Sequence, residues 1–426
     1  MKNFPKNFLW GAATSSHQVE GDNFYNNWWR WENFEKTVER SGKACDHYRL
    51  FEQDFDLARE LNHNAHRFSV EWSRIYPKAD EFKSDEVEHY LKVVAALRKR
   101  NIEPVVTLHH FTNPHWLLDF GGWANPKAVR YFVEYVEHIV KALGADVKYW
   151  VTINEPMIYV YYSFIIGIWP PGVKSTREAF KVLNNLILAH SNAYKVIHRI
   201  YEENKWPRPY VSIAQNILAF TPCRNFFLDK EAAYLRDQVY NQLLLKVFTT
   251  GQMKIPGLIY DRLSFAKETL DFIGLNYYSR HFVRFDLFKP GELFGRQCSL
   301  DHHKAGRLNE MNSEVYPEGL LKVLLSLKKY NLPIIITENG TAETDDNFRW
   351  QFIKGHLKYL SRAINAGVDV RGYLYWSLLD NFEWHHGFKP RFGLTEVDYA
   401  TQERKIRESA RKFAQVCKSN SIEELT

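Results

Sequence analysis

The sequence has few cysteines, and none of them falls in a recognisable motif. Only four of the 426 residues are cysteine, namely Cys45, Cys223, Cys298 and Cys417, and their wide spacing fits no zinc-binding pattern. In a chain of this size, four scattered thiols are typical of a reducing compartment rather than of a disulfide framework. We therefore expect free thiols. The first residues also lack the apolar core of a signal peptide, so we expect a cytoplasmic protein.

The sequence also has no long apolar run and no strong excess of one charge. Its mean hydropathy is −0.42, and the lack of any stretch of about 20 apolar residues excludes a membrane-spanning protein. Lys and Arg number 56 against 50 Asp and Glu, and they are scattered along the chain. A nucleic-acid-binding protein would gather its basic residues on one face. We expect neither a membrane nor a nucleic acid as partner, and the sequence leaves a homo-oligomer open.

Motifs for cofactors and metals are missing as well. The sequence contains neither of the glycine-rich patterns that bind nucleotide phosphates, Gly-x-x-x-x-Gly-Lys and Gly-x-Gly-x-x-Gly. Histidine pairs do recur, at His109–His110, His302–His303 and His385–His386. However, no cluster of carboxylates and no His-x-x-x-His helix accompanies them. We therefore expect no cofactor and no metal ion.

What the sequence does contain is a regular alternation of short β-rich runs and longer helical patterns. The β-rich runs are Phe8–Ala13, Ala65–Trp72, Glu103–His109, Lys148–Asn154, Tyr210–Gln215, Phe272–Tyr277, Pro333–Thr337 and Val370–Trp376. Most are continuously apolar, which is typical of strands buried on both faces of a parallel sheet. Between them lie helical patterns with one apolar stripe, at Asp54–Leu61, Val87–Arg98, Ala128–Leu143, Ala179–Ile200 and Trp350–Ala366.

This alternation predicts an α/β protein built on a single (β/α)8 TIM barrel. No Gly/Ser-rich or Pro-rich linker divides the chain, so we expect one domain over residues 1–426. A doubly wound parallel sheet is the alternative fold. Aromatic residues make up 15% of the chain, which fits either a large core or surfaces that stack on sugar rings.

Two glutamates stand at the ends of strands that would lie roughly across the barrel from each other. In a (β/α)8 barrel the chemistry belongs at the carboxyl ends of the strands, where Glu155 follows the fourth strand and Glu338 the seventh. A single buried glutamate would be explained by an Arg partner or a helix cap, because a buried carboxylate needs a partner. Two facing carboxylates are what glycoside hydrolysis uses. Pro156 disfavours the helical region for the residue before it, so we expect Glu155 to stay extended.

The ordered motifs of the chain resemble those of one enzyme family. Asn154–Glu155–Pro156 and Ile336–Gly340 are similar to the two signature segments of glycoside hydrolase family 1, the family of β-glucosidases and β-galactosidases. Further segments similar to this family are Phe8–Gly21, Arg67–Arg74, Thr107–His110, Trp376–Trp384 and Arg391–Leu394. The resemblance therefore covers nearly the whole chain.

The resemblance implies a role for each matching residue. Glu338 would be the nucleophile and Glu155 the general acid/base of a retaining β-glycosidase with a covalent glycosyl-enzyme intermediate. The residues expected to bind the terminal sugar are Gln18, His110, Asn154, Trp376, Glu383 and Trp384, with Trp376 as the floor on which the sugar stacks. Those expected to orient and stabilise Glu338 are Arg67, Asn276 and Tyr278. The implied substrates are β-glycosides or oligosaccharides that end in a β-D-glucosyl, galactosyl or fucosyl residue.

Two alternative functions stay open at this point. A transglycosylase of the same family would share the first chemical step, and a non-catalytic sugar-binding barrel would share the fold. The outer pocket departs from the family pattern, with Phe111 where Trp is common and Ser313 where many members carry an aromatic platform for the leaving group. The pair Glu383 and Trp384 further implies little activity on 6-phospho-sugars, because the carboxylate would repel the phosphate.

Overall fold

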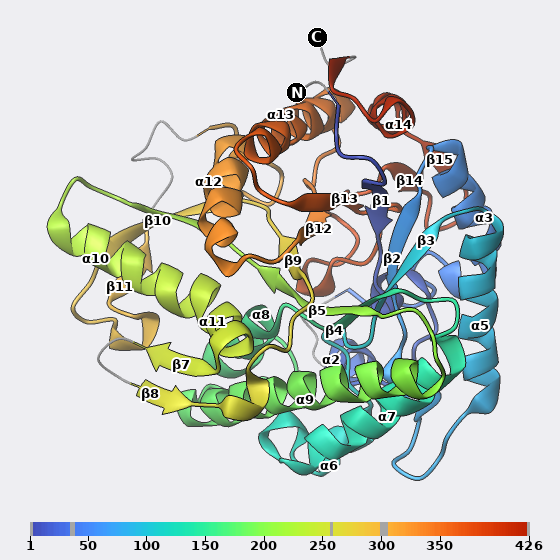
Figure 1. The fold of residues 1–426 in the computed structure, drawn as a ribbon, viewed down its shortest axis with the longest axis horizontal. Coiled ribbons are helices and arrows are strands. Elements are labelled where there is room, and N and C mark those ends of the chain that lie inside the picture. Colours follow the sequence, from blue (N-terminus) through green and yellow to red (C-terminus); the bar gives the residue numbers. More distant parts are fainter. Residues whose placement is uncertain (1–2, 35–38, 256–258, 299–305, 424–426) are drawn as a thin grey trace.

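The computed structural model describes residues 3–34, 39–255, 259–298 and 306–423, and its centre is a closed barrel of eight parallel strands (Figure 1). In barrel order the strands are β1 (Leu9–Ala13), β2 (Ala65–Ser69), β3 (Glu103–Thr107), β4 (Tyr149–Asn154), β5 (Tyr210–Asn216), β9 (Ile273–Asn276), β12 (Ile334–Asn339) and β13 (Val370–Trp376). Each overlaps one of the eight predicted runs. This confirms the (β/α)8 barrel and shows that the doubly wound alternative is wrong.

The strands form because each offers apolar side chains to two buried faces. Inside the barrel, Val105, Val151, Ala214, Ile335 and Leu374 belong to one buried cluster. Their neighbours along the strands pack outward against the helices, since successive side chains of a strand point to opposite faces. The interior of the barrel is therefore filled by side chains, and a ligand has to bind at the ends of the strands.

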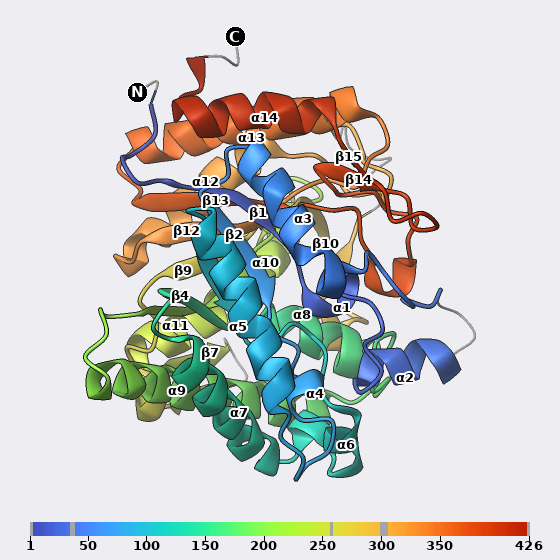
Figure 2. The same cartoon turned by 90° about the vertical axis from the view of Figure 1, so that its right-hand side faces the viewer.

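The helices lie outside the barrel, where Figures 1 and 2 show them packed around the strands. The five predicted helices are present, each longer than its predicted pattern, as α3 (His47–Glu60), α5 (Ser84–Lys99), α7 (Lys127–Leu143), α9 (Thr176–Glu203) and α13 (Asp346–Asn365). Helix α7 illustrates the cause, because Phe132, Val136, Ile139 and Leu143 recur at helical spacing and are all buried.

Shorter helices complete the outer layer. They are α1 (Ser16–Val19), α2 (Asn27–Phe34), α4 (Trp72–Ile75), α6 (His115–Asp119), α8 (Pro156–Val160), α10 (Phe227–Arg236), α11 (Leu243–Thr250), α12 (Pro317–Leu327) and α14 (Glu408–Ser419). Helix α4 begins at Trp72, so the predicted second strand extends three residues too far. Within the ranges described, none of the helices is both long enough and apolar enough to pass through a bilayer.

Small sheets lie beside the barrel in the described part of the chain. Strands β6 (Ala219–Pro222), β10 (Arg280–Phe285) and β11 (Gly295–Gln297) form one sheet with β10 in the middle, and Figure 1 shows it near α10. The other pairs are β7 (Gln252–Ile255) with β8 (Ile259–Arg262), and β14 (Thr395–Val397) with β15 (Arg404–Ile406).

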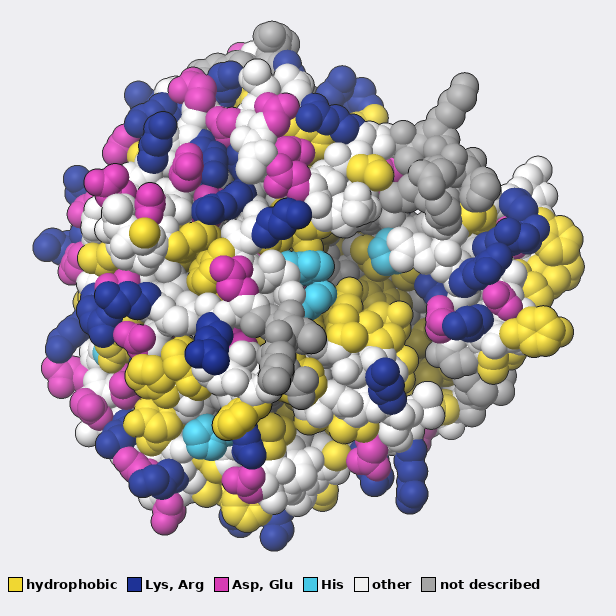
Figure 3. Space-filling view, turned by 180° about the vertical axis from the view of Figure 1, so that it is seen from behind, with side chains coloured by type: hydrophobic (Ala, Val, Ile, Leu, Met, Phe, Trp, Pro, Cys, Tyr) yellow, Lys and Arg dark blue, Asp and Glu magenta, His cyan; other side chains and the backbone are white. Residues whose placement is uncertain are grey.

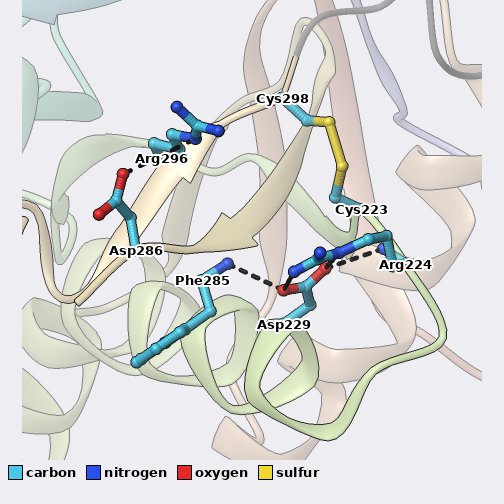
Figure 4. Close-up of a disulfide and its surroundings, with 7 residues drawn as sticks. All are labelled: Cys223, Arg224, Asp229, Phe285, Asp286, Arg296 and Cys298. Carbon is cyan, nitrogen blue, oxygen red and sulfur yellow. Dashed lines mark hydrogen bonds and ion pairs between the residues drawn. A yellow bond between two sulfur atoms is a disulfide. The ribbon is translucent and has the colours of Figure 1, made fainter. Parts of the chain in front are cut away.

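The expectation of four free thiols is wrong for two of them. Cys223 and Cys298 form a disulfide across 75 residues of sequence, as Figure 4 shows, whereas Cys45 and Cys417 are free and buried. Sheet pairing brings the two cysteines together. The amide of Cys223 donates to the carbonyl of Val283 and that of Cys298 to Phe282, so both chains flank β10 at the same level. Cysteine spacing alone cannot reveal such a long-range pairing.

Candidate active site

A cavity of about 750 Å³ lies at the carboxyl ends of the barrel strands. Figure 3 shows a hollow near the middle of the face seen from behind, with hydrophobic and histidine side chains along its edge. The predicted site residues that line the cavity are Gln18, His110, Asn154, Glu155, Tyr278, Glu338, Trp376, Glu383 and Trp384. The other two, Arg67 and Asn276, are fully buried and bond to lining residues. The structure therefore brings every predicted site residue together.

Glu338 is held by one partner on each carboxylate oxygen. At the end of β12, its Oε1 accepts a 2.5 Å hydrogen bond from Nη1 of Arg67, and its Oε2 accepts a 2.6 Å bond from the hydroxyl of Tyr278. Burial and the nearby Glu338 charge raise the pKa of Tyr278 well above its ordinary value, so its hydroxyl stays protonated and can donate. The charge-assisted bond from Arg67 is the stronger kind, and both contacts fix the carboxylate in one orientation.

Glu155 does not adopt the extended conformation that we expected. Its φ and ψ are 44° and 57°, in the left-handed region, which is uncommon for a residue with a side chain. The cause is the short connection: β4 ends at Asn154 and α8 begins at Pro156, so the chain has to turn within one residue. The Glu155 amide also donates to the carbonyl of Ala214 at 2.7 Å, which anchors the turn to β5.

The carboxyl group of Glu155 is buried and bonded to neutral amides. Its Oε1 accepts from Nδ2 of Asn276 at 2.7 Å and from Nδ2 of Asn216 at 3.0 Å. Burial, followed by the charge of Glu338, raises the pKa of Glu155 to about 8. Since no cation contacts it in the described part of the chain, Glu155 is protonated at neutral pH. The two carboxyl groups thus lie in different environments: Glu338 is ion-paired, and Glu155 is buried among amides.

The role expected for Asn276 needs a correction. We expected it to support Glu338, but its Nδ2 donates to Glu155 at 2.7 Å and to Oδ1 of Asn154 at 3.2 Å. The hydroxyl of Thr337 donates to its Oδ1 at 2.6 Å, which fixes which end of the amide faces Glu155. The sequence could not distinguish the two contacts, because β9 lies between β5 and β12 in the barrel and its last residue can reach either carboxyl group.

Sequence reasoning missed two residues near the acid. Asn216, the last residue of β5, contacts Glu155, and the hydroxyl of Tyr240 donates to Oδ1 of Asn216 at 2.9 Å. Asn216 could have been found, because polar residues at strand ends were the signal used for the other strands. Tyr240 had no such signal, since it lies in the π-helical segment η3 (Asp237–Gln242) outside the barrel strands.

The sugar-binding residues predicted from the resemblance gather beside Glu338. Nε2 of Gln18 donates to Oε2 of Glu383 at 3.1 Å, and the ring of His110 lies nearly parallel to those of Trp376 and Trp384, 5.8 Å and 6.1 Å from them. Burial, with the charge of Arg67, lowers the pKa of His110 well below its ordinary value, so the ring is neutral. Burial and the Glu338 charge raise the pKa of Glu383 to about 8.

Asn154 is more constrained than a freely available ligand group. Its Oδ1 accepts from Arg67 at 2.7 Å and from Asn276 at 3.2 Å, and its Nδ2 lies 3.2 Å from Nε2 of His110. It therefore links the residues around both carboxyl groups, and its contact with a sugar hydroxyl stays a prediction.

Metal ligation has no support from the residues that the structure describes. Among them, no group of three His, Cys, Asp or Glu side chains is arranged to hold a metal ion. His109 bonds Asn113 instead, and His385 bonds the indole of Trp169. The pair His302–His303 lies outside the described residues.

Known proteins are similar to this chain over nearly its whole length. The family model described as Glycosyl hydrolase family 1 matches residues 1–422. This chain belongs to glycosyl hydrolase family 1. It is 32% identical to β-glucosidase A of Thermotoga maritima over an alignment of 455 residues that covers 100% of both chains.

Solved structures of family 1 enzymes match the fold closely. A β-glycosidase from Pyrococcus horikoshii superposes with a TM-score of 0.92 at 39% identity, over 99% of this chain and 96% of that one. The Thermotoga maritima β-glucosidase in complex with glucoimidazole superposes with a TM-score of 0.92 at 32% identity, over 99% and 100% of the two chains. The family 1 chain described here is thus a glycoside hydrolase, a β-glycosidase similar to β-glucosidases.

Proposed function

We propose that this family 1 enzyme is a retaining β-glycosidase that removes terminal β-D-glucosyl, galactosyl or fucosyl residues in two displacements. One observation carries the proposal. Two carboxyl groups line the same cavity, of which Glu338 is ion-paired with Arg67 while the pKa of Glu155 is raised to about 8. An ionised carboxylate beside a protonated one is the pair that a nucleophile and a general acid require.

In the first step, Glu338 attacks the anomeric carbon while Glu155 gives its proton to the glycosidic oxygen. The bond between the anomeric carbon and that oxygen breaks, and the aglycone leaves as a neutral alcohol. The sugar is then bound to Glu338 as an ester of the α configuration. Tyr278 and Arg67 hold the two oxygens of Glu338, so the attacking atom is positioned before substrate binds.

In the second step, the same residue acts as a base. Formation of the ester removes the negative charge of Glu338, which is one cause of the raised pKa of Glu155. The pKa of Glu155 therefore falls, and its carboxylate can take a proton from water. The water oxygen attacks the anomeric carbon, the ester bond breaks, and Glu338 is restored as a carboxylate. The second inversion returns the sugar to the β configuration.

The sugar end of the cavity favours a neutral sugar. Gln18 and Glu383 together offer an amide and a carboxyl group joined at 3.1 Å, which suits two neighbouring hydroxyls. Among the described residues, Arg236 is the one Lys or Arg side chain that lines the cavity, and it pairs with Glu292. A 6-phosphate would thus find no unpaired cation among the described lining residues to compensate its charge. We propose that 6-phospho-glycosides are poor substrates.

The experiment that tests the proposal is to identify the anomer that is released first. Aryl β-glycosides of the gluco, galacto, fuco, manno, xylo and 6-phospho series are hydrolysed, and the reaction is followed by proton NMR before the sugar mutarotates. We expect the β-anomer first, and the α-anomer would refute retention. If the wild-type enzyme hydrolyses none of these glycosides, so that Glu338→Ala changes nothing, the sugar-binding alternative would be favoured. Glycosides formed with an added alcohol would favour transfer over hydrolysis.

A further inference from the structure

A chain of hydrogen bonds runs from the proposed acid to a tyrosine that bonds to neither carboxyl group. The Nδ2 group of Asn216 donates to Oε1 of Glu155 at 3.0 Å, and the hydroxyl of Tyr240 donates to Oδ1 of Asn216 at 2.9 Å. The three residues come from three places in the fold, since Glu155 follows β4, Asn216 ends β5 and Tyr240 lies in η3. Tyr240 therefore reaches Glu155 through the amide of Asn216.

The segment η3 is fixed against the end of β5, and this places the hydroxyl of Tyr240. The backbone carbonyl of Tyr240 accepts from Nε2 of Gln215 at 2.9 Å. The side chain of Asn241 bonds to both backbone groups of Leu218, accepting from its amide at 3.1 Å and donating to its carbonyl at 2.8 Å. π-Helical turns occur frequently at functional sites. The position of Tyr240 relative to Asn216 thus depends on several bonds between η3 and the end of β5.

The tyrosine decides which end of the Asn216 amide faces Glu155. An amide side chain has an acceptor on one side and a donor on the other, so that either could face the acid. Burial and the charge of Glu155 raise the pKa of Tyr240 well above its ordinary value, so its hydroxyl keeps its proton. In the described part of the chain, that hydroxyl has one hydrogen-bond acceptor, Oδ1 of Asn216. This bond leaves Nδ2 of Asn216 to face Glu155.

The direction of the amide matters because Glu155 has to be an acid in the first step and a base in the second. An N–H group that donates to a carboxyl oxygen favours the carboxylate. An amide oxygen in the same place could only accept a hydrogen bond, and so would favour the protonated form. Asn276 presents one N–H group to Oε1 of Glu155 at 2.7 Å, and Asn216 presents a second.

We propose that Tyr240 is a positioning residue that holds the N–H group of Asn216 toward Glu155 and so favours the base form of Glu155 in the second step. This inference rests on the proposed glycosidase function and adds a residue to the same reaction. Tyr240 acts through Asn216, so its removal should change the balance between the acid and base forms of Glu155 more than the geometry of attack by Glu338.

Other charged and titratable groups also act on Glu155, and replacing Tyr240 by Phe leaves their charges unchanged. Including Tyr240, these groups are Glu338, Glu383, Arg67, Tyr162, Tyr278 and Tyr240. The charge of Glu338 raises the pKa of Glu155 and that of Arg67 lowers it. Because a protonated tyrosine carries no charge, a shift seen in Tyr240→Phe would report the orientation of the amide.

The test is the pH dependence of Tyr240→Phe, which removes the hydroxyl and keeps the ring that packs against Phe220. For an alkyl glycoside, the alkaline decline of kcat/KM should move up by about 0.5–1 pH unit, because the amide is then free to turn. For a 2,4-dinitrophenyl glycoside, whose second step should limit kcat, kcat rises with pH as Glu155 ionises. We expect this acidic limb to move up as well, by a similar amount.

A purely structural role would give a different result. A displaced Glu155 would lower the rates at every pH and leave both limbs where they are in the wild type, which would overturn the inference. The proposed function would then still stand, as long as the wild type hydrolyses the aryl glycosides. A wild type that hydrolyses none of them would refute the function itself.

Two further variants locate the effect. Tyr330→Phe is the matched control, since the hydroxyl of Tyr330 donates to Oε1 of Gln242 in the same η3 segment at 2.8 Å and Gln242 does not bond to Glu155; both limbs should stay in place. Asn216→Ala should move both limbs at least as far as Tyr240→Phe does. Adding Tyr240→Phe to Asn216→Ala should then have no further effect, because the two residues act in series. An equal shift in Tyr330→Phe, or additive shifts in the double variant, would contradict the assignment.

Discussion

At the scale of single residues, Glu155 and Glu338 have the same side chain and different surroundings. Arg67 and Tyr278 each hold one oxygen of Glu338, while Asn276 and Asn216 share one oxygen of Glu155. The other oxygen of Glu155 has no hydrogen-bond partner within the described residues and is the one from which a proton can be delivered. The different roles proposed for Glu155 and Glu338 therefore follow from the residues around each carboxyl group and not from the carboxyl groups themselves.

Replacement of the proposed acid should depend on the leaving group. In Glu155→Gln, we expect kcat/KM to fall about 10²–10⁴-fold for alkyl glycosides, because their alkoxide leaving groups need a proton. For 2,4-dinitrophenyl glycosides, whose leaving group is stable without a proton, the first step should be nearly unaffected. Steady-state and burst kinetics with both substrates measure this difference. Equal losses in the first step for both leaving groups would argue against Glu155 as the acid.

The pH dependence should report the same residue. Glu155 has to be protonated in the free enzyme, and burial and Glu338 raise its pKa to about 8. Because the acid form is lost above its pKa, kcat/KM for an alkyl glycoside should decline as the pH rises through about 8. Glu155→Gln, assayed with the dinitrophenyl substrate, should lack this alkaline decline. A decline that persists unchanged in the variant would assign it to another group.

At the scale of secondary-structure elements, long-range pairing places residues that local patterns cannot. The strand–helix alternation predicted the eight barrel strands, since most of the runs are continuously apolar and the helical patterns lie between them. The left-handed turn at Glu155 was missed because it depends on how soon α8 follows β4. The contacts of Asn276 were misassigned because they depend on register between β5, β9 and β12. Tyr240 was missed because it lies in a π-helical segment and not at the end of a barrel strand.

The disulfide between the two outer strands is a testable consequence of such pairing. It joins the chain after β6 to the chain after β11 over 75 residues, and a bridge of this kind contributes about 2–4 kcal/mol to stability. We expect a reducing agent to lower the Tm by about 3–6 °C, and Cys298→Ser to lower it similarly. In that variant the reducing agent should have no further effect. Two results together would contradict the bridge: a wild-type Tm that the reducing agent leaves unchanged, and four reactive thiols in wild-type protein that is denatured without reducing agent.

At the scale of the whole molecule, the closed barrel is what makes two distant glutamates neighbours. Strands β4 and β12 lie three places apart among eight, so residues separated by more than 180 positions reach one cavity. The roles of these residues were predicted from the resemblance to family 1. That two carboxyl groups face each other across a barrel was predicted from the strand pattern and the residues at the strand ends. A single domain over residues 1–426 and a cytoplasmic location stay predictions.

The most direct measurement is to trap the intermediate and find which residue carries the sugar. A 2-deoxy-2-fluoro β-glycosyl fluoride slows the second step more than the first, so that the glycosyl-enzyme accumulates. After proteolysis, mass spectrometry should find one modified peptide, with the sugar bound to Glu338, and Glu338→Gln should give none. A sugar bound to another residue, or inactivation without a covalent adduct, would contradict the proposed double displacement.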